Sequence, residues 1–208
     1  MRLILIRHGE SYHSRDGIIA ELSGCRGLTD YGLAQVHSLA DRFRTTCEVR
    51  DSHVLMSSPV LRAWQTAALL AEMLALGPVV QERDLCEVHP GLADGLTWDA
   101  YRTTHGVFDL LASPLRPFAP EGESWVQFLD RVRATLERLA TQFAGQTVVA
   151  VTHAGFIVAS ILVLFDVWRP GTGARLDPEY TSITEWGNAD GTWRLIRFND
   201  VGHVFNLP

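Results

Sequence analysis

Four basic side chains in this sequence share one kind of position, at the end of a predicted strand or in the first turn of the helix that follows one. They are Arg7, His8, Arg62 and His153. Because ligands of α/β folds bind at the carboxyl ends of the strands, we expect these distant segments to meet in space. Two guanidinium groups and two imidazoles beside helix N-termini form a site for a dianion, and phosphate is the obvious candidate.

The hydrophobic pattern predicts the elements that position these side chains. The all-apolar runs at residues 2–6 and 147–152 are typical of strands buried on both faces of a parallel sheet. Strands are predicted at residues 2–6, 53–57, 79–81, 147–152, 181–187 and 192–199. Helices are predicted after the cap residues Thr29 and Ser58 and over residues 123–143 and 156–165, with a tight turn at residues 153–155.

The alternation of strands and helices predicts the fold class α/β, a three-layer α/β/α sandwich with a mostly parallel central sheet. A chain of 208 residues with 47% hydrophobic residues is long enough for one good-sized core, which predicts a single domain over residues 1–208. Residues 84–122 contain four prolines and are predicted to form a loop-rich cover over the substrate.

Charge and composition argue against several classes of protein. The formal net charge is −6 and the 18 basic residues are scattered, which argues against a nucleic-acid partner. Every basic residue is an arginine, so lysine chemistry such as a Schiff base is excluded. The three cysteines have neither disulfide nor zinc-site spacing, and no apolar run reaches the ~20 residues that cross a bilayer. We therefore expect a cytoplasmic protein with no membrane contact.

Seven segments of the chain, in this order, resemble the histidine phosphatase superfamily, also called the phosphoglycerate mutase-like family. They are LIRHGES at residues 5–11, LTDYG at 28–32, SSPVLRAWQTA at 57–67, LCE at 85–87 with Gly91 and GLT at 95–97, EGES at 121–124, THAG at 152–155, and SITE at 182–185. A lone Arg-His-Gly would recur by chance, but seven segments in the family's order are specific.

The resemblance implies a phosphoglycerate mutase-like fold and a metal-independent phosphatase without a cofactor, which hydrolyses a small phosphorylated metabolite through a phosphohistidine. In this reading His8 is the nucleophile, Arg7, Arg62 and His153 hold the phosphate, and Glu87 donates the proton. The physical chemistry agrees with the first four roles, because planar arginine forks suit the charge of a transferring phosphoryl group. Glu87 must stay protonated to act as the acid, whereas nearby arginines favour its charged form. A neutral His8 can attack in line if its other ring nitrogen donates to a backbone carbonyl, such as that of the next residue.

The resemblance also implies a set of substrate contacts. They are Arg7, Ser11, Ser14, Ser23, Gly24, Arg62 and the backbone N–H of Ala154. The chain departs from the family at two of these positions, since the family often has Asn where Ser14 stands and Gly where Ala154 stands. Ser14 has the shorter reach toward a phosphate.

Several alternatives stay open. His89 is a weaker rival to Glu87 as the acid, and His153 could share that role. A phosphoglycerate mutase-type phosphomutase and a non-catalytic phosphate-binding module compete with the phosphatase, although the chain lacks the lysine and the paired arginines of the family's mutases. A homodimer is as compatible with the sequence as a monomer.

The sequence does not identify the phosphate ester. Four further arginines could favour a second acidic group on the substrate: Arg15, Arg26, Arg102 and Arg116. The histidines without motif support are expected at the surface or at the edge of the core: His13, His37, His53, His105 and His203.

Overall fold

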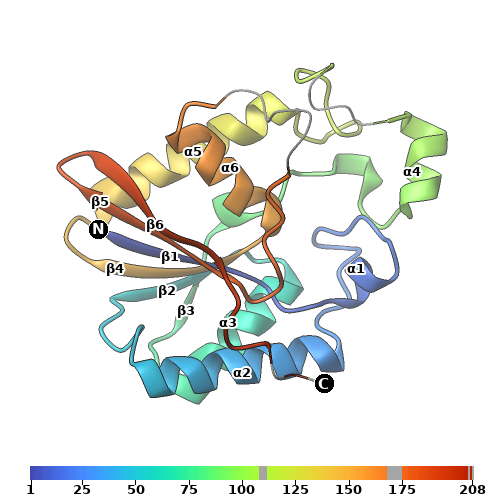
Figure 1. Cartoon of the computed structure of the whole chain (residues 1–208). Coiled ribbons are helices and arrows are strands. Elements are labelled where there is room, and N and C mark those ends of the chain that lie inside the picture. Colours follow the sequence, from blue (N-terminus) through green and yellow to red (C-terminus); the bar gives the residue numbers. More distant parts are fainter. Residues whose placement is uncertain (108–111, 168–174, 206, 208) are drawn as a thin grey trace.

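The computed structural model describes residues 1–107, 112–167, 175–205 and 207, and within them one sheet of six strands runs through the centre of the molecule (Figure 1). The strands are β1 (Arg2–Arg7), β2 (Val54–Ser57), β3 (Val79–Gln81), β4 (Thr147–Thr152), β5 (Ile183–Ala189) and β6 (Thr192–Asp200). Their order is β3-β2-β4-β1-β5-β6. The pairs among β1 to β4 are parallel, whereas β5 pairs antiparallel with β1 and with β6.

Helices cover both faces of this sheet (Figure 1). Helices α2 (Asp30–Thr46) and α3 (Leu61–Leu74) cover one face, and α5 (Trp125–Gln142) and α6 (Ala154–Leu164) cover the other. The short helices α1 (Tyr12–Arg15) and α4 (Trp98–His105) lie beyond the end of the sheet (Figure 1). Leu3 and Leu5 of β1 belong to the core under α5 and α6, while Ile4 and Ile6 belong to the core under α2 and α3. The all-apolar run of β1 therefore reflects burial on both faces, and the predicted three-layer α/β/α class is confirmed.

Two predicted helix starts are wrong. Ser58 does not cap α3, because Val60 has extended backbone angles and is itself the N-cap. The hydroxyl of Ser58 accepts from the Val60 N–H at 3.3 Å and also contacts His153. The predicted tight turn at residues 153–155 is the helix start itself, with His153 as N-cap and Ala154 as the first residue of α6.

The segment before β5 also differs from its prediction. Thr181 has a φ of 57°, in the left-handed region, so β5 begins at Ile183 and not at residue 181. The N–H of Thr181 donates to the carbonyl of Arg7 at 3.0 Å. This segment therefore crosses the carboxyl end of β1, where the basic side chains were expected to gather.

Among the described residues of 83–122, the structure has the 3-10 turns Arg83–Leu85 and Gly91–Ala93 and the helix α4, joined by irregular connections. Among the described residues, no helix combines the length and the apolar character that a membrane span requires.

Candidate active site

The carboxyl ends of β1 and β4 bring His8 and His153 together. The two strands are parallel neighbours in which Arg7 pairs with Thr152, so the residues that follow them lie side by side. The N–H of His8 donates to the carbonyl of Thr152 at 3.0 Å, and the two imidazole centroids are 5.2 Å apart. The convergence of these two residues, expected from the strand-end rule, is present in the structure.

His8 is held with its proton on one defined nitrogen. Its Nδ1 lies 2.7 Å from the carbonyl oxygen of Gly9, which can only accept, so Nδ1 carries the proton. Nε2 consequently has a free lone pair, and it accepts a hydrogen bond from Nε of Arg62 at 3.0 Å. Burial, together with the charge of Arg62 and the neighbouring His153 and Arg7, holds the pKa of His8 well below 6.5. His8 is therefore a neutral imidazole whose lone pair lies on Nε2.

Arg62 is positioned by the first turn of α3 and is only 3% exposed. Its Nη1 donates to the carbonyl of Ala20 at 2.9 Å. One turn later on the same helix, the hydroxyl of Thr66 donates to the Arg62 carbonyl and accepts the N–H of Gly9 at 3.1 Å. Helix α3 thus fixes both the guanidinium and the backbone beside His8.

Arg7 is oriented by the segment that crosses the end of β1. Its guanidinium carbon lies 3.8 Å from the centroid of the Tyr180 ring, and its Nη1 donates to the carbonyl of Pro178. Burial lowers the pKa of Arg7 below its ordinary value. The Tyr180 ring is also 5.9 Å from the ring of His8. Sequence reasoning missed Tyr180, because nothing local marks an aromatic residue that packs against a strand more than 170 positions away.

His153 is 1% exposed, and its Nε2 contacts the hydroxyl of Ser58 at 2.9 Å. The same hydroxyl lies 3.2 Å from the sulfur of Cys86. Burial and the charge of Arg62 lower the pKa of His153 well below 6.5, so its imidazole is neutral. Its Nδ1 is buried without a hydrogen-bond partner among the described residues.

Glu87 caps the N-terminus of α6. Its Oε2 accepts the N–H of Gly155 at 2.8 Å, and its Oε1 accepts the N–H of Val88 at 3.1 Å. A Cβ on Gly155 would lie 1.9 Å from Oε1 of Glu87, so the carboxylate has this position only because residue 155 has no side chain. The family's THAG segment therefore matters for Glu87 as well as for His153.

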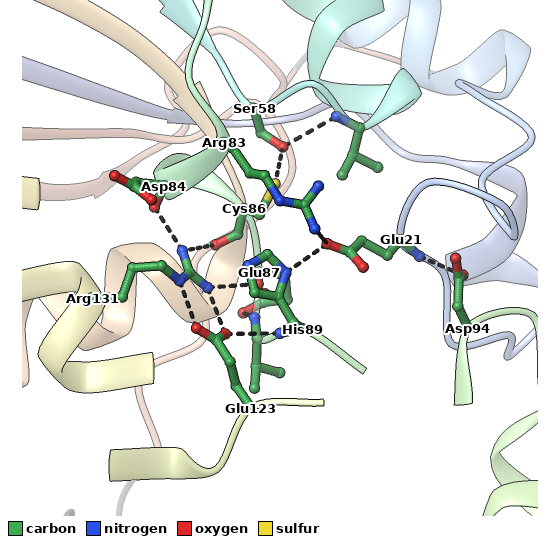
Figure 2. A network of polar contacts seen from close by, with 12 residues as sticks. Glu21, Ser58, Arg83, Asp84, Cys86, Glu87, His89, Asp94, Glu123 and Arg131 are labelled. Carbon is green, nitrogen blue, oxygen red and sulfur yellow. Dashed lines mark hydrogen bonds and ion pairs between the residues drawn. The ribbon is translucent and has the colours of Figure 1, made fainter. Parts of the chain in front are cut away.

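The loop that carries Glu87 is held from α5 by Arg131 (Figure 2). Its Nη1 donates to the carbonyls of Asp84 at 2.7 Å and Cys86 at 3.2 Å, and its Nη2 donates to the carbonyl of Glu87 at 3.0 Å. Glu123 pairs with the same guanidinium through both carboxylate oxygens at 2.7 Å. Arg131 is a positioning residue that the sequence analysis missed, although its place eight residues after Glu123 on an amphipathic helix was visible.

A cavity of about 330 Å³ opens at this point. Its lining includes six of the residues predicted from the sequence: Arg7, His8, Ser14, Arg62, Glu87 and Ala154. Ser11 lies behind this lining, fully buried, with its hydroxyl on Ser14 and His13. Ser23 and Gly24 are not brought to the cavity, because their N–H groups donate to the carboxylate of Asp94 at 2.9 and 3.1 Å.

His13 was expected at the surface or the core edge, and the structure places it, half-buried, in the wall of the cavity. Its ring lines the cavity with its centroid 6.2 Å from that of His8. Nδ1 contacts the hydroxyl of Ser11 at 2.7 Å, and Nε2 contacts that of Ser14 at 3.2 Å. Burial and the charges of Arg62 and Arg7 lower the pKa of His13 to about 3. His89, the rival acid, does not line the cavity and is bound to Glu21.

Comparison with known proteins agrees with this geometry. The family model of the histidine phosphatase superfamily (branch 1) matches residues 3–201. The metal-independent phosphoserine phosphatase of Arabidopsis thaliana is 29% identical, with 99% of this chain and 84% of that protein covered. A histidine-to-alanine mutant of Entamoeba histolytica phosphoserine phosphatase, solved in complex with phosphoserine, superimposes with a TM-score of 0.74 at 25% identity and 98% coverage of both chains.

A second solved structure, YhfR of Bacillus stearothermophilus, has a TM-score of 0.81 at 25% identity, again with 98% of both chains covered. The sheet, the arrangement of Arg7, His8, Arg62 and His153 at its carboxyl edge, and these likenesses lead to one assignment. The chain belongs to the histidine phosphatase superfamily (branch 1), as a histidine-phosphatase-type hydrolase.

Proposed function

We propose that this phosphatase hydrolyses a small phosphate monoester through a phosphohistidine formed on Nε2 of His8. The observation that carries the proposal is the hydrogen-bond pattern of His8, in which Gly9 fixes the proton on Nδ1 and leaves Nε2 free to attack. Arg62, which donates to this same nitrogen, stands where an oxygen of the incoming phosphoryl group would be. Arg7 and the unpartnered Nδ1 of His153 supply further contacts to that group.

The reaction has two steps. Nε2 of His8 attacks phosphorus while the P–O bond to the alcohol breaks, and a protonated Glu87 gives its proton to the departing oxygen. Water then attacks phosphorus, Glu87 takes up a proton, and the P–N bond breaks to release inorganic phosphate. Ser14 and the N–H of Ala154, which line the cavity, are the substrate contacts that we retain. The placement of Ser11, Ser23 and Gly24 gives their proposed contacts no support.

The purified protein is expected to hydrolyse p-nitrophenyl phosphate in the presence of a metal chelator and to be inhibited by vanadate, a mimic of the transferring group. Activity that disappears with chelator and returns with a divalent metal would contradict the histidine mechanism. The competing mutase is tested by adding 3-phosphoglycerate with its bisphosphate. Isomerisation faster than phosphate release would show that a sugar acid, and not water, accepts the phosphoryl group.

Glu87→Gln is expected to slow poor leaving groups selectively. Hydrolysis of an alkyl phosphate should fall by about 10²-fold or more, the usual contribution of a general acid, because an alkoxide needs a proton as it departs. Hydrolysis of p-nitrophenyl phosphate should fall far less, since its leaving group is stable as an anion. The measurement is kcat/KM for both esters.

Gly155→Ala should give the same selective loss, because the new methyl group takes the place of the Glu87 carboxylate. Glu137→Gln, an exposed change on α5, serves as the matched control. An equal slowing of both esters by Glu87→Gln would remove Glu87 from the acid role.

A further inference from the structure

The cavity has two chemically different ends. The basic side chains described above stand at the phosphate end. The other end is lined mainly by apolar and aromatic side chains: Ile18, Ile19, Val88, Pro90, Trp98 and Phe118. A pocket wall of this kind recognises the organic part of a ligand by its shape and apolar surface.

Backbone hydrogen bonds and contacts between aromatic rings hold the apolar wall in place. Backbone hydrogen bonds join loop 17–21 to residues 95–98. The Ile19 N–H donates to the Leu96 carbonyl at 2.8 Å, and the Trp98 N–H donates to the Gly17 carbonyl at 3.1 Å. Phe118 stacks on Tyr101 with ring centroids 4.6 Å apart. The indole of Trp98 stands edge-on to both of these rings, at 5.9 and 5.8 Å, while the residue stays 42% exposed. Trp98 therefore offers a fixed aromatic surface to whatever occupies the cavity.

One carboxylate, that of Glu21, interrupts this wall. Its Oε1 accepts from Nδ1 of His89 at 2.6 Å and from Arg83 at 3.5 Å, as Figure 2 shows. Within the described part of the chain, Oε2 has no hydrogen-bond partner, although the side chain is only 13% exposed. A half-satisfied, largely buried carboxylate favours a hydrogen-bond donor on the ligand.

Among the described lining residues, the only arginines are Arg7 and Arg62, which stand at the phosphate end, so none remains for a second acidic group on the substrate. Arg15, Arg26, Arg102 and Arg116, which the sequence left as candidates, are absent from the described lining of the cavity. The first three pair with Asp16 or Asp99, and Arg116 donates to the carbonyls of His105 and Val107. A second carboxylate or phosphate on the ligand would meet Glu21 and apolar side chains.

We propose that the substrate is a monoester whose organic part is aromatic and carries an ammonium or hydroxyl donor that reaches Glu21, and that it lacks a second acidic group. The inference rests on the proposed function, because it places the phosphate at His8. Trp98 and Phe118 pack on the aromatic part, and Oε2 of Glu21 accepts from the donor.

Three 2-arylethyl phosphates whose leaving alkoxides have closely similar basicity separate these contributions. The unsubstituted phenyl ester, its para-aminomethyl derivative and its para-carboxylate derivative differ only at the end remote from phosphorus. We expect kcat/KM of the aminomethyl ester to exceed that of the carboxylate ester by about tenfold or more, because hydrogen bonds to charged groups are the strong ones. Glu21→Gln should remove most of this difference, and the exposed control Glu72→Gln should leave it unchanged.

Trp98→Ala should lower kcat/KM for the phenyl ester while leaving ethyl phosphate, which has no ring, almost unaffected. Equal or faster hydrolysis of the carboxylate ester, or a preference that survives Glu21→Gln, would overturn the inference and leave the phosphatase mechanism intact. No hydrolysis of any ester, p-nitrophenyl phosphate included, would instead overturn the proposed function and the inference with it.

Discussion

His8→Ala is expected to abolish turnover and to abolish labelling of the protein by a radioactive phosphate ester. The proton on Nδ1 leaves the lone pair of His8 on Nε2, and His8 lines the cavity. Both ring nitrogens of His13 contact hydroxyl groups, and His153 is not among the described lining residues. Loss of a nucleophile costs on the order of 10⁴-fold or more in kcat, and what remains comes from binding alone.

The label itself provides the decisive measurement. A phosphohistidine is lost in acid, so the native protein should give a rapidly formed, acid-labile label after quenching. His37→Ala, which removes an exposed histidine of α2, is the matched control and should label normally. Persistent labelling of His8→Ala would exclude His8 as the nucleophile, and unfolding curves of both variants would show whether either has lost its structure.

Arg62 should give the second largest effect. Arg62→Ala removes a donor that is already aimed at the reacting nitrogen, and loss of one such preorganised donor costs about 10² to 10³-fold in kcat. Arg62→Lys retains the charge but loses the planar fork that holds Nε on His8 and Nη1 on the Ala20 carbonyl, so it should recover only a small part of the rate.

Steady-state kinetics and vanadate binding together test the role of Arg62. Both variants should bind vanadate more weakly and lose kcat, whereas Arg194→Lys, at an exposed position of β6, should change neither. A normal kcat in Arg62→Lys would mean that charge alone suffices and that the fork has no catalytic role.

The strand-end rule explains how much of the site could be predicted from the sequence. His8 and His153 follow two apolar runs, and because those runs are neighbouring parallel strands, their ends had to meet. Local pattern could not show which distant groups complete the site. Ser58 reads locally as a helix cap, yet its hydroxyl contacts a histidine 95 residues away. The N–H groups of Ser23 and Gly24 are engaged by Asp94, at a separation of 70 or more residues.

His13 and Glu21 line the cavity, yet the sequence pattern did not predict either of them as a site residue. His13 lies in the four-residue helix α1 and Glu21 in the irregular segment that follows it, and neither segment has a hydrophobic period that reports which side chains face inward. The single domain over residues 1–208, the cytoplasmic location, the absence of a nucleic-acid partner and the choice between monomer and homodimer stay predictions.

The crowding of cationic and neutral basic groups at the carboxyl edge of the sheet also sets how the folded state responds to acid. His8 and His153 are buried in their neutral form, with pKa values well below the ordinary 6.5. Once the pH falls below that value, the unfolded chain takes up protons that the folded site does not bind. The free energy of unfolding is therefore greatest above about pH 6.5 and declines below it by about 1.4 kcal/mol per pH unit for each histidine. We expect a bound phosphate, which offsets the charge of Arg7 and Arg62, to reduce that decline, because it raises the pKa of both histidines in the folded state.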